Sequence, residues 1–261
     1  MLSPFAALHG LRVGCVQYLN AKPLIVPYDG EVIFEHPSRL ADLLAAGEID
    51  VALIPVFEAL RQPHFPIVDG VAIASRGAVY SVFLAHCSPL KEIRVVSLDP
   101  ASRTSNNLLR CILAEFHGLH PAFEASGAYP EGNRGLLLIG DQAIRFRESP
   151  HEEVEYLDLG QEWLAKTGLP FVYAVWQIRP EIANAPAAAA ALRAIKTAGL
   201  HRVREIGRLQ KNFDPKFAEH YLTEHVHFEL AAEEKTGLAR FRSLLQKHGL
   251  IDASAVPLRF V

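Results

Sequence analysis

The sequence predicts an α/β protein of two lobes, each a mixed, mostly parallel sheet flanked by helices, with a cleft between the lobes. Short apolar runs alternate with helical patterns twice along the chain, before and after about residue 80. Two long β-rich runs, 78–85 and 169–177, flank the middle segment. Half of the 261 residues are hydrophobic, which is enough for a substantial core.

The first alternating series opens with an apolar run that ends in a polar turn containing Asn20. Its expected elements are strand 11–16, a short helix after the turn, strand 31–36, helix 38–47 and strand 50–55. We expect Ser38 to cap the longer helix and Gly47 to end it, because these residue types favour those positions. This β-α-β order favours parallel pairing.

Two further β-rich runs, 68–74 and 78–85, are expected to form an antiparallel pair or one continuous ribbon. A second alternating series follows them. Its expected elements are strand 93–98, a helix from about residue 104, strand 122–125, strand 136–139 and a helix from Asp141. The pattern of glycine, apolar strand and turn at 135–141 resembles that at 47–55, which suggests two related lobes.

The last part of the chain is helical in character. The expected helices are an alanine-rich segment from Pro186, then 201–210, 214–221 and 232–248. Their outer faces are charged, which indicates packing on a sheet. Because β-rich runs flank the middle segment, we expect residues 81–177 to form a lobe inserted into a first lobe made of residues 1–80 and 178–261.

Charge and composition argue against several classes of partner. The formal net charge of −3 offers no basic surface for nucleic acid. No window approaches eighteen uncharged apolar residues, so no membrane span is expected. The first ten residues lack a charged region followed by a full apolar stretch, so they do not read as a secretory signal, and a cytoplasmic protein is expected.

No metal or cofactor is expected either. Cys15, Cys87 and Cys111 are widely separated in apolar surroundings and are interpreted as buried free thiols. His225 and His227 alternate as in a strand, without an accompanying ligand motif. The sequence contains neither glycine-rich nucleotide-binding motif, so cofactor-free chemistry is expected.

The stretch from Asp99 to Asn107 predicts a strand, a polar turn and a helix start. Ser102, Thr104 and Ser105 can cap that helix, yet no acidic residue occurs from 100 to 114, and Arg103 adds positive charge. A helix start has unpaired N–H groups and a positive dipole end, so this one is open to a carboxylate or phosphate. An ordinary cap with a solvated arginine is the alternative.

Three strand-to-helix turns are expected to face the cleft, because ligands of open α/β sheets bind beyond the carboxyl ends of the strands. They are the turns at Asn20, at 102–105 and at Gly140-Asp141. Asn20 has the alternative role of a helix cap, and Ser81 that of a strand hydroxyl bonded to backbone.

Six strings along residues 11–180 carry a family resemblance. They are Val16-Gln17-Tyr18-Leu19-Asn20-Ala21-Lys22-Pro23-Leu24, Ala46-Gly47-Glu48-Ile49-Asp50-Val51-Ala52-Leu53-Ile54-Pro55, Tyr80-Ser81-Val82-Phe83-Leu84, Leu98-Asp99-Pro100-Ala101-Ser102-Arg103-Thr104-Ser105, Leu138-Ile139-Gly140-Asp141-Gln142-Ala143 and Pro170-Phe171-Val172-Tyr173-Ala174-Val175-Trp176. The fold pattern resembles type II periplasmic binding proteins. The strings resemble the menaquinone biosynthesis enzymes of the futalosine pathway built on that fold, most closely the chorismate dehydratases.

This resemblance implies conversion of chorismate, a small dicarboxylate, to 3-[(1-carboxyvinyl)oxy]benzoate with loss of water. It assigns catalytic roles to Asn20 and Ser81. The implied substrate contacts are Asn20, Ser81, Ser102, Arg103, Thr104, Ser105, Gly140 and Asp141. Arg103 would aim at a substrate carboxylate or at the opposite lobe.

No side-chain base is evident in these turns. The enolpyruvyl carboxylate of the substrate is therefore expected to take the proton, with Asn20 and Ser81 fixing its rotamer; Asp141 is the rival base. A sister lyase of the 1,4-dihydroxy-6-naphthoate synthase type uses a histidine base, and neither His86 nor His117 lies in a matching turn. A non-catalytic binding protein for a small carboxylate is the third possibility.

Overall fold

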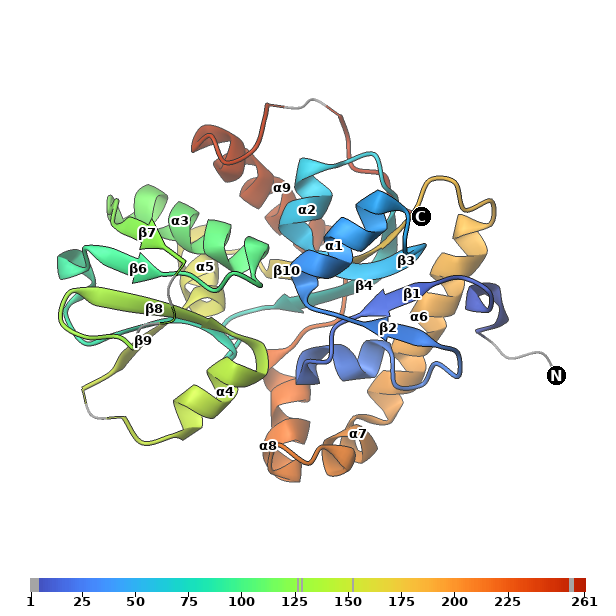
Figure 1. The fold of residues 1–261 in the computed structure, drawn as a ribbon, viewed down its shortest axis with the longest axis horizontal. Coiled ribbons are helices and arrows are strands. Elements are labelled where there is room, and N and C mark those ends of the chain that lie inside the picture. The colour runs from blue at the N-terminus through green and yellow to red at the C-terminus, as the bar shows by residue number, and fades with distance from the viewer. Residues whose placement is uncertain (1–4, 126, 128, 152, 254–255) are drawn as a thin grey trace.

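The computed structural model describes residues 5–125, 127, 129–151, 153–253 and 256–261. These residues form two α/β lobes that lie side by side, each around its own sheet (Figure 1). The predicted fold class is therefore confirmed. Among the described residues, no helix is long and apolar enough to cross a membrane.

The first lobe is built on a five-stranded sheet of described residues with the order β2-β1-β3-β10-β4. Its strands are β2 (Val32–Phe34), β1 (Val13–Cys15), β3 (Val51–Pro55), β10 (Phe171–Ile178) and β4 (Ile67–Ser75). β1 pairs in parallel with β2 and β3, while β10 runs antiparallel to β3 and β4. The carboxyl ends of β1 and β3 therefore meet at one edge, as the β-α-β pattern predicted.

The second lobe repeats this arrangement with the order β7-β6-β8-β5-β9, again as far as the described residues show. Its strands are β7 (Ala122–Glu124), β6 (Val95–Ser97), β8 (Arg134–Ile139), β5 (Val82–His86) and β9 (Glu155–Asp158). β6 pairs in parallel with β7 and β8, and β5 is antiparallel to β8 and β9. β3 and β8, whose sequences show the weak internal similarity, thus hold the same central position.

The crossings between the lobes differ from the prediction. β4 and β5 do not pair with each other, because each lies in a different sheet. β10 lies between β3 and β4, whereas the predicted division at residue 177 assigned it to the inserted lobe. A strand bonded on both sides to first-lobe strands belongs with them. We therefore propose the same two-lobe division with the return crossing moved to before Phe171.

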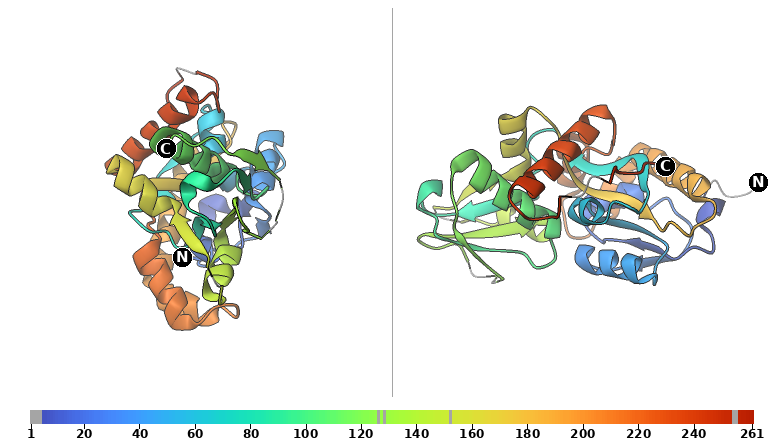
Figure 2. Two further views of the ribbon diagram at one scale, coloured as in Figure 1. Left: turned by 90° about the vertical axis from the view of Figure 1, so that its left-hand side faces the viewer. Right: turned by 90° about the horizontal axis from the view of Figure 1, so that it is seen from above.

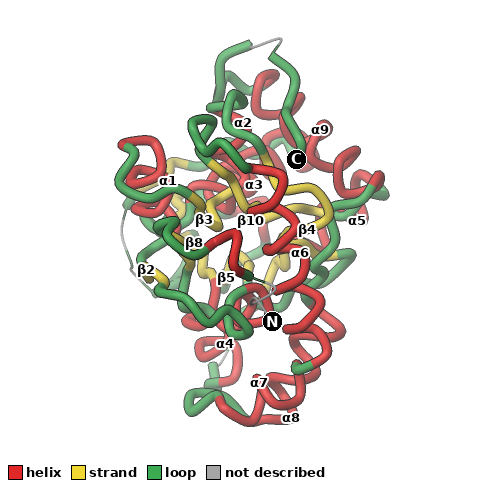
Figure 3. The backbone as a smooth tube through the Cα atoms, turned by 90° about the vertical axis from the view of Figure 1, so that its right-hand side faces the viewer, coloured by secondary structure: helices red, strands yellow, loops and turns green. Residues whose placement is uncertain are grey.

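Helices cover both sheets. Those of the first lobe are the short η1 (Ala6–Leu8) and η2 (Leu19–Leu24), α1 (Pro37–Ala46), α2 (Val56–Arg61), α6 (Ala185–His201), α7 (Val203–Leu209), α8 (Pro215–His220), the π-helical turn η4 (Tyr221–His225) and α9 (Ala232–Lys247). Those of the second are η3 (Leu90–Glu92), α3 (Arg103–His117), α4 (Gly140–Glu148) and α5 (Leu159–Thr167). Helices α7 and α8 lie at the end opposite α2 and α9 (Figure 3).

Two helix predictions need correction. The N-cap of α1 is His36 rather than Ser38, because Pro37 occupies the first helical position, where its missing N–H costs nothing. Gly47 ends that helix in the left-handed region, at φ 75°, as predicted. Neither α2 nor the β9-α5 unit was predicted, although Asp158 is a standard cap whose carboxylate accepts the N–H groups of Gly160 and Gln161.

An aromatic cluster ties the lobes together behind the cleft. Trp163 of α5 packs edge-on against Phe171 of β10 at 5.2 Å between ring centroids, and Phe241 of α9 lies 5.0 Å from Phe171. All three side chains are buried. Helix α9 therefore packs across the junction of the two lobes, as the view from above shows (Figure 2).

Candidate active site

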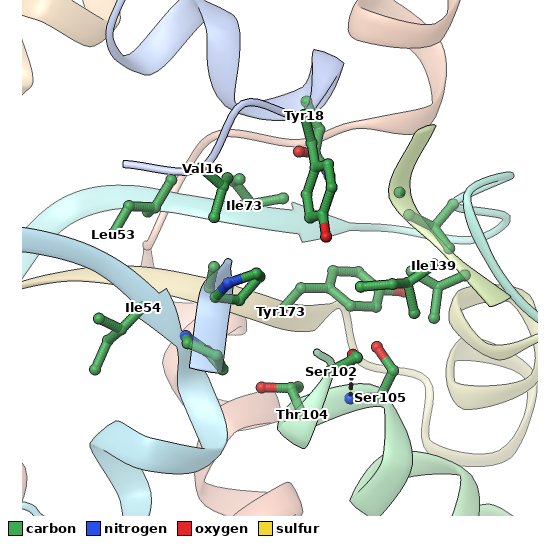
Figure 4. Close-up of a pocket in the computed structure, with 17 residues that line it drawn as sticks. Val16, Tyr18, Leu53, Ile54, Ile73, Ser102, Thr104, Ser105, Ile139 and Tyr173 are labelled. Carbon is green, nitrogen blue, oxygen red and sulfur yellow. Dashed lines mark hydrogen bonds between the residues drawn. The ribbon is translucent and has the colours of Figure 1, made fainter. Parts of the chain in front are cut away.

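A cavity of about 70 Å³ lies where the strand ends of the two lobes face each other. First-lobe strand ends and turns form one side, and the starts of α3 and α4 form the other (Figure 4). The lining residues are Val16, Tyr18, Asn20, Pro37, Leu53, Ile54, Pro55, Ile73, Val79, Val82, Ser102, Thr104, Ser105, Ile139, Gly140, Tyr173 and Ala174.

The walls of this cavity are apolar and aromatic. The rings of Tyr18 and Tyr173 project into it from the first lobe, and Ile139 faces them from the end of β8 (Figure 4). The Tyr173 hydroxyl is hydrogen-bonded to the Ser75 hydroxyl at 3.1 Å, so its polar end is satisfied. Such walls suit a flat hydrocarbon ring whose polar groups lie at its edges.

The start of α3 provides the polar floor. The Ser102 hydroxyl accepts the N–H of Ser105 at 3.3 Å, and the first turn holds no acidic residue. Within the described part of the chain, the N–H groups of Arg103 and Thr104 have no hydrogen-bond acceptor. The structure therefore has the open helix start that the sequence predicted, with the three hydroxyl residues beside it (Figure 4).

Arg103 points away from this floor. Its guanidinium bonds both carboxylate oxygens of Asp42, at 2.9 and 3.1 Å, and Glu58 at 3.1 Å. Both acids belong to first-lobe helices, so the side chain follows the second of the two predicted alternatives, a contact with the opposite lobe. A contact with substrate would require these ion pairs to give way.

Two more polar bridges join the lobes at the cavity. The Thr104 hydroxyl accepts the N–H of Phe57 at 3.1 Å, and the Asp141 carboxylate accepts the N–H of Leu19 at 2.9 Å. In both cases a second-lobe side chain accepts an N–H group at the start of a first-lobe helix that has no acceptor within that helix. Thr104 and Asp141, both predicted substrate contacts, thus have protein partners here.

Gly140 allows the lobes to approach closely. Its φ of 58° is left-handed, its N–H donates to the Ser81 carbonyl at 2.8 Å, and an added Cβ would lie 3.2 Å from the Tyr18 ring. The backbone therefore favours glycine at position 140, whether or not Gly140 contacts a substrate.

Two carboxylates lie close to Tyr18. Burial raises the pKa of Asp141 and of Asp99, although hydrogen bonds from the Leu19 and Ala101 N–H groups oppose the rise. Burial, and then the charges of Asp99 and Asp141, raise the pKa of Tyr18 to about 12. Tyr18 is therefore protonated at neutral pH and can donate a hydrogen bond to a ligand.

Asn20 and Ser81 occupy different depths. Asn20 lines the cavity, and its amide oxygen is buried with no hydrogen-bond partner in the part of the chain that the structure describes. Ser81 is fully buried, and its hydroxyl lies 2.7 Å from that of Tyr221, behind Val79 and Val82 of the cavity wall. Of the eight predicted site residues, five line the cavity, Asn20, Ser102, Thr104, Ser105 and Gly140. Asp141 lines an adjoining hollow, and Ser81 and Arg103 line neither space.

A wider hollow adjoins the cavity and shares Tyr18 with it. Its volume is about 1040 Å³. Its charged lining residues are the cations Lys22, Arg39 and Arg145 and the carboxylates Asp99 and Asp141. Since opposite charges attract, the excess of cationic side chains favours an anionic ligand in this hollow.

Sequence reasoning missed three tyrosines, Tyr18, Tyr173 and Tyr221. Tyr18 and Tyr173 lie inside the strings quoted above, and Tyr18 is two residues from the predicted Asn20. Tyr221 follows a helix in the C-terminal part, where no local signal points to the cleft. Among the described residues, no three histidines, cysteines or acids are grouped as metal ligands would be.

The two lobes, the mixed sheets and the site at the strand ends define the class as a protein with the periplasmic-binding-protein fold. The CA3427 gene product of Candida albicans, described as having the generic form of that fold, matches with a TM-score of 0.61. The match is 12% identical in sequence and covers 94% of this chain and 91% of that one. It supports the fold alone.

A narrower assignment comes from sequence. The menaquinone biosynthesis family model matches residues 11–247, and the chain belongs to that family. It is similar to the chorismate dehydratase of Thermus thermophilus, at 32% identity over 257 residues, covering 89% of this chain and 94% of the relative. The chorismate dehydratase of Campylobacter jejuni is 26% identical over 227 residues, covering 86% and 88%.

Proposed function

We propose that this protein dehydrates chorismate to 3-[(1-carboxyvinyl)oxy]benzoate in menaquinone biosynthesis. The observation that carries the proposal is the cavity itself, in which the open start of α3 and the unpaired amide oxygen of Asn20 flank apolar walls. Chorismate is a ring with a carboxylate at one end and an enolpyruvyl ether and a hydroxyl at the other. The two relatives named above support the assignment.

The reaction removes the hydrogen of the ring carbon that bears the enolpyruvyl ether as a proton, and this proton leaves with the hydroxyl of the neighbouring ring carbon as one water. Because the product ring is aromatic, the bond changes have a strong driving force. The protein has to position the substrate and stabilise the charge that develops. The negative charge left on the ring carbon that loses the proton spreads through the adjacent double bond towards the ring carboxylate, where the start of α3 would stabilise it.

The enolpyruvyl carboxylate is the proposed proton acceptor. Asn20 would hold its rotamer from the cavity wall, with Ser81 supporting it from behind that wall, so that proton transfer takes place within the bound substrate. The buried Asn20 amide oxygen needs a donor, which it would find in the leaving hydroxyl or in the carboxyl group once that has taken the proton. A bond formed only after the transfer stabilises the transition state more than the bound substrate.

The direct test is incubation of the purified protein with chorismate, with the products followed by chromatography and mass. We expect loss of one water, and we expect Asn20→Ala to lower kcat/KM by about 100-fold or more, as for other preorganised polar groups. Asn184→Ala is the matched control, because Asn184 is also an asparagine at a helix start but caps α6, away from the cavity.

Two outcomes would overturn the proposal. Chorismate that stays unchanged but raises the melting temperature would make the protein a binding protein for this ligand class. Failure with chorismate combined with turnover of a bicyclic precursor of 1,4-dihydroxy-6-naphthoate would assign the sister reaction.

A further inference from the structure

Tyr221 places a hydroxyl between the two groups to which the proposed chemistry assigns the main roles. The residue is 1% exposed, and its Oη lies 2.7 Å from the Ser81 Oγ. The Asn20 side chain also interacts with this hydroxyl, and the interaction lowers the pKa of Tyr221 against the larger effect of burial. The three residues come from η2, from the crossing before β5 and from η4, so the fold assembles them from distant parts of the sequence.

The hydroxyl directs both neighbours. Burial raises the pKa of Tyr221, so the group is neutral, with one hydrogen to donate and two lone pairs to accept. If the Asn20 amide nitrogen donates to Oη, the amide oxygen is left for a ligand, in agreement with its lack of a protein partner. If Oη–H donates to Ser81, the serine hydrogen is left for another acceptor. The Tyr221 hydroxyl would thus leave the amide oxygen of Asn20 free to accept a hydrogen bond and the hydroxyl hydrogen of Ser81 free to donate one.

Tyr221 is held firmly from the other side. Its ring stacks on Phe217 at 6.1 Å between centroids with an angle of 13° between the planes. The same π-helical turn is tied to the crossing by His225, whose Nδ1 lies 2.8 Å from the Ala78 carbonyl oxygen. Single π-helical turns of this kind concentrate at functional sites, because they shift one side chain out of helical register.

The segment that carries Ser81 is held as well. Tyr80 has a φ of 67°, a left-handed conformation that is strained for a residue other than glycine. The Asp158 carboxylate stabilises it by accepting the Tyr80 N–H at 2.8 Å. Ser81 therefore emerges from a constrained backbone directly opposite Tyr221.

We propose that Tyr221 is a positioning residue for the dehydration, acting through Ser81 and Asn20 without touching the reacting atoms. This inference rests on the proposed function and extends it to the C-terminal part of the chain. Without the Tyr221 hydroxyl, the Ser81 hydroxyl and the Asn20 amide would still be present but would lose their fixed orientation.

The test is Tyr221→Phe, which keeps the ring and removes the hydroxyl. We expect kcat for chorismate to fall about ten- to a hundredfold, because small misplacements of positioning groups cost about that much. KM should stay within about threefold, because the apolar walls and the α3 start are intact. Tyr28→Phe is the matched control: it removes another buried hydroxyl, which donates to the Leu8 carbonyl remote from the cavity, and should leave kcat unchanged.

Two further variants separate positioning from general stability. Phe217→Leu removes the stacked ring but leaves the hydroxyl, and should lower kcat by a smaller factor at unchanged KM. In a Ser81→Ala, Asn20→Ala background, Tyr221→Phe should change the remaining kcat by less than about threefold, because a residue that acts through two others has no separate effect.

Each outcome decides the proposal. If Tyr221→Phe and Phe217→Leu both retain the kcat of the parent, which itself converts chorismate, the positioning role is overturned while the proposed function stands. The role is equally overturned if Tyr28→Phe loses as much kcat as Tyr221→Phe at a similar fall in melting temperature. A parent protein that does not convert chorismate overturns the proposed function and this inference with it.

Discussion

The helix starts that face the cleft differ between the two lobes, although the strands before them hold the same positions in their sheets. After β1 and β3, the N–H groups of Leu19 and Phe57 donate to side chains from the opposite lobe, Asp141 and Thr104. After β6, Ser102 caps the start of α3, and among the described residues no first-lobe acid accepts its backbone N–H groups; Asp42 and Glu58 bind only the Arg103 side chain. The topology is shared, so the residues that face each start decide whether it binds the other lobe or is left for a ligand.

The largest expected effect on activity comes from placing a carboxylate at the open start of α3. Ser102→Asp should keep or raise the melting temperature, because aspartate caps helices well and its charge suits the dipole. It should lower kcat/KM for chorismate by about 100-fold, or about 2.8 kcal/mol, because it occupies the place of the substrate carboxylate. Ser102→Asn, which caps without charge, should retain activity. Normal kcat/KM in Ser102→Asp would mean that the α3 start binds no anion.

Removing the hydroxyl that accepts an N–H group at the start of α2 should lower the free energy of unfolding. Thr104→Val keeps the shape of the side chain but leaves the buried Phe57 N–H without its acceptor. We expect a loss of about 1–3 kcal/mol in the free energy of unfolding, measured with urea. Thr104→Ser retains the hydroxyl and serves as the control. Equal stability of the two variants would show that this bridge does not hold the lobes.

A smaller effect is expected at the start of η2. In Asp141→Asn, the amide oxygen can still accept the Leu19 N–H, so kcat should fall by less than about tenfold if the substrate provides the base. Purified variant and parent are compared with chorismate under single-turnover conditions. A thousandfold fall with intact chorismate binding would identify Asp141 as the base and overturn substrate-assisted proton transfer.

The smallest effect concerns Asp99, whose pKa burial raises in the folded state. From about pH 4, where an ordinary aspartate ionises, up to the raised folded value, the unfolded chain releases the proton first, so stability is lost as the pH rises. Asp99→Asn should remove this loss, so its stability relative to the parent in urea unfolding should rise with pH from about pH 4 up to the raised folded pKa of Asp99. A constant difference across that range would contradict the assigned cause.

The local part of this comparison could be predicted from sequence. The α3 start combines a serine cap with a run free of acids, and both signals lie within a few residues of each other. Most strands and the longer helices were predicted for the same reason. The β9-α5 unit has equally local signals, since Asp158 caps α5 and Gly168 ends it, so the sequence also contained enough information to predict this unit.

The remaining features depend on residues distant in sequence. Arg103 meets Asp42 and Glu58, and Ser81 meets Tyr221, only once both lobes and the C-terminal helices are assembled. No periodicity or capping pattern reports such meetings, because these patterns describe one element at a time. The burial of Ser81 behind the cavity wall follows from the same assembly.

The placement of β10 has a consequence for the order of folding. β4 is an almost entirely buried strand whose only partner within the described sheet is β10, about one hundred residues later. During synthesis on the ribosome, all strands of the second lobe, which lie within residues 82–158, are made before β10. Until β10 is made, β4 lacks its partner strand in the first-lobe sheet. After β10 is made, the outer edge of β4 is covered in two steps, first when Ala72 and Ala74 bond to the carbonyl groups of Phe228 and His227. Ile67 and Asp69 follow last, when they bond to the carbonyl groups of Arg259 and Val261. Chains shortened at this end should therefore aggregate through β4 during synthesis.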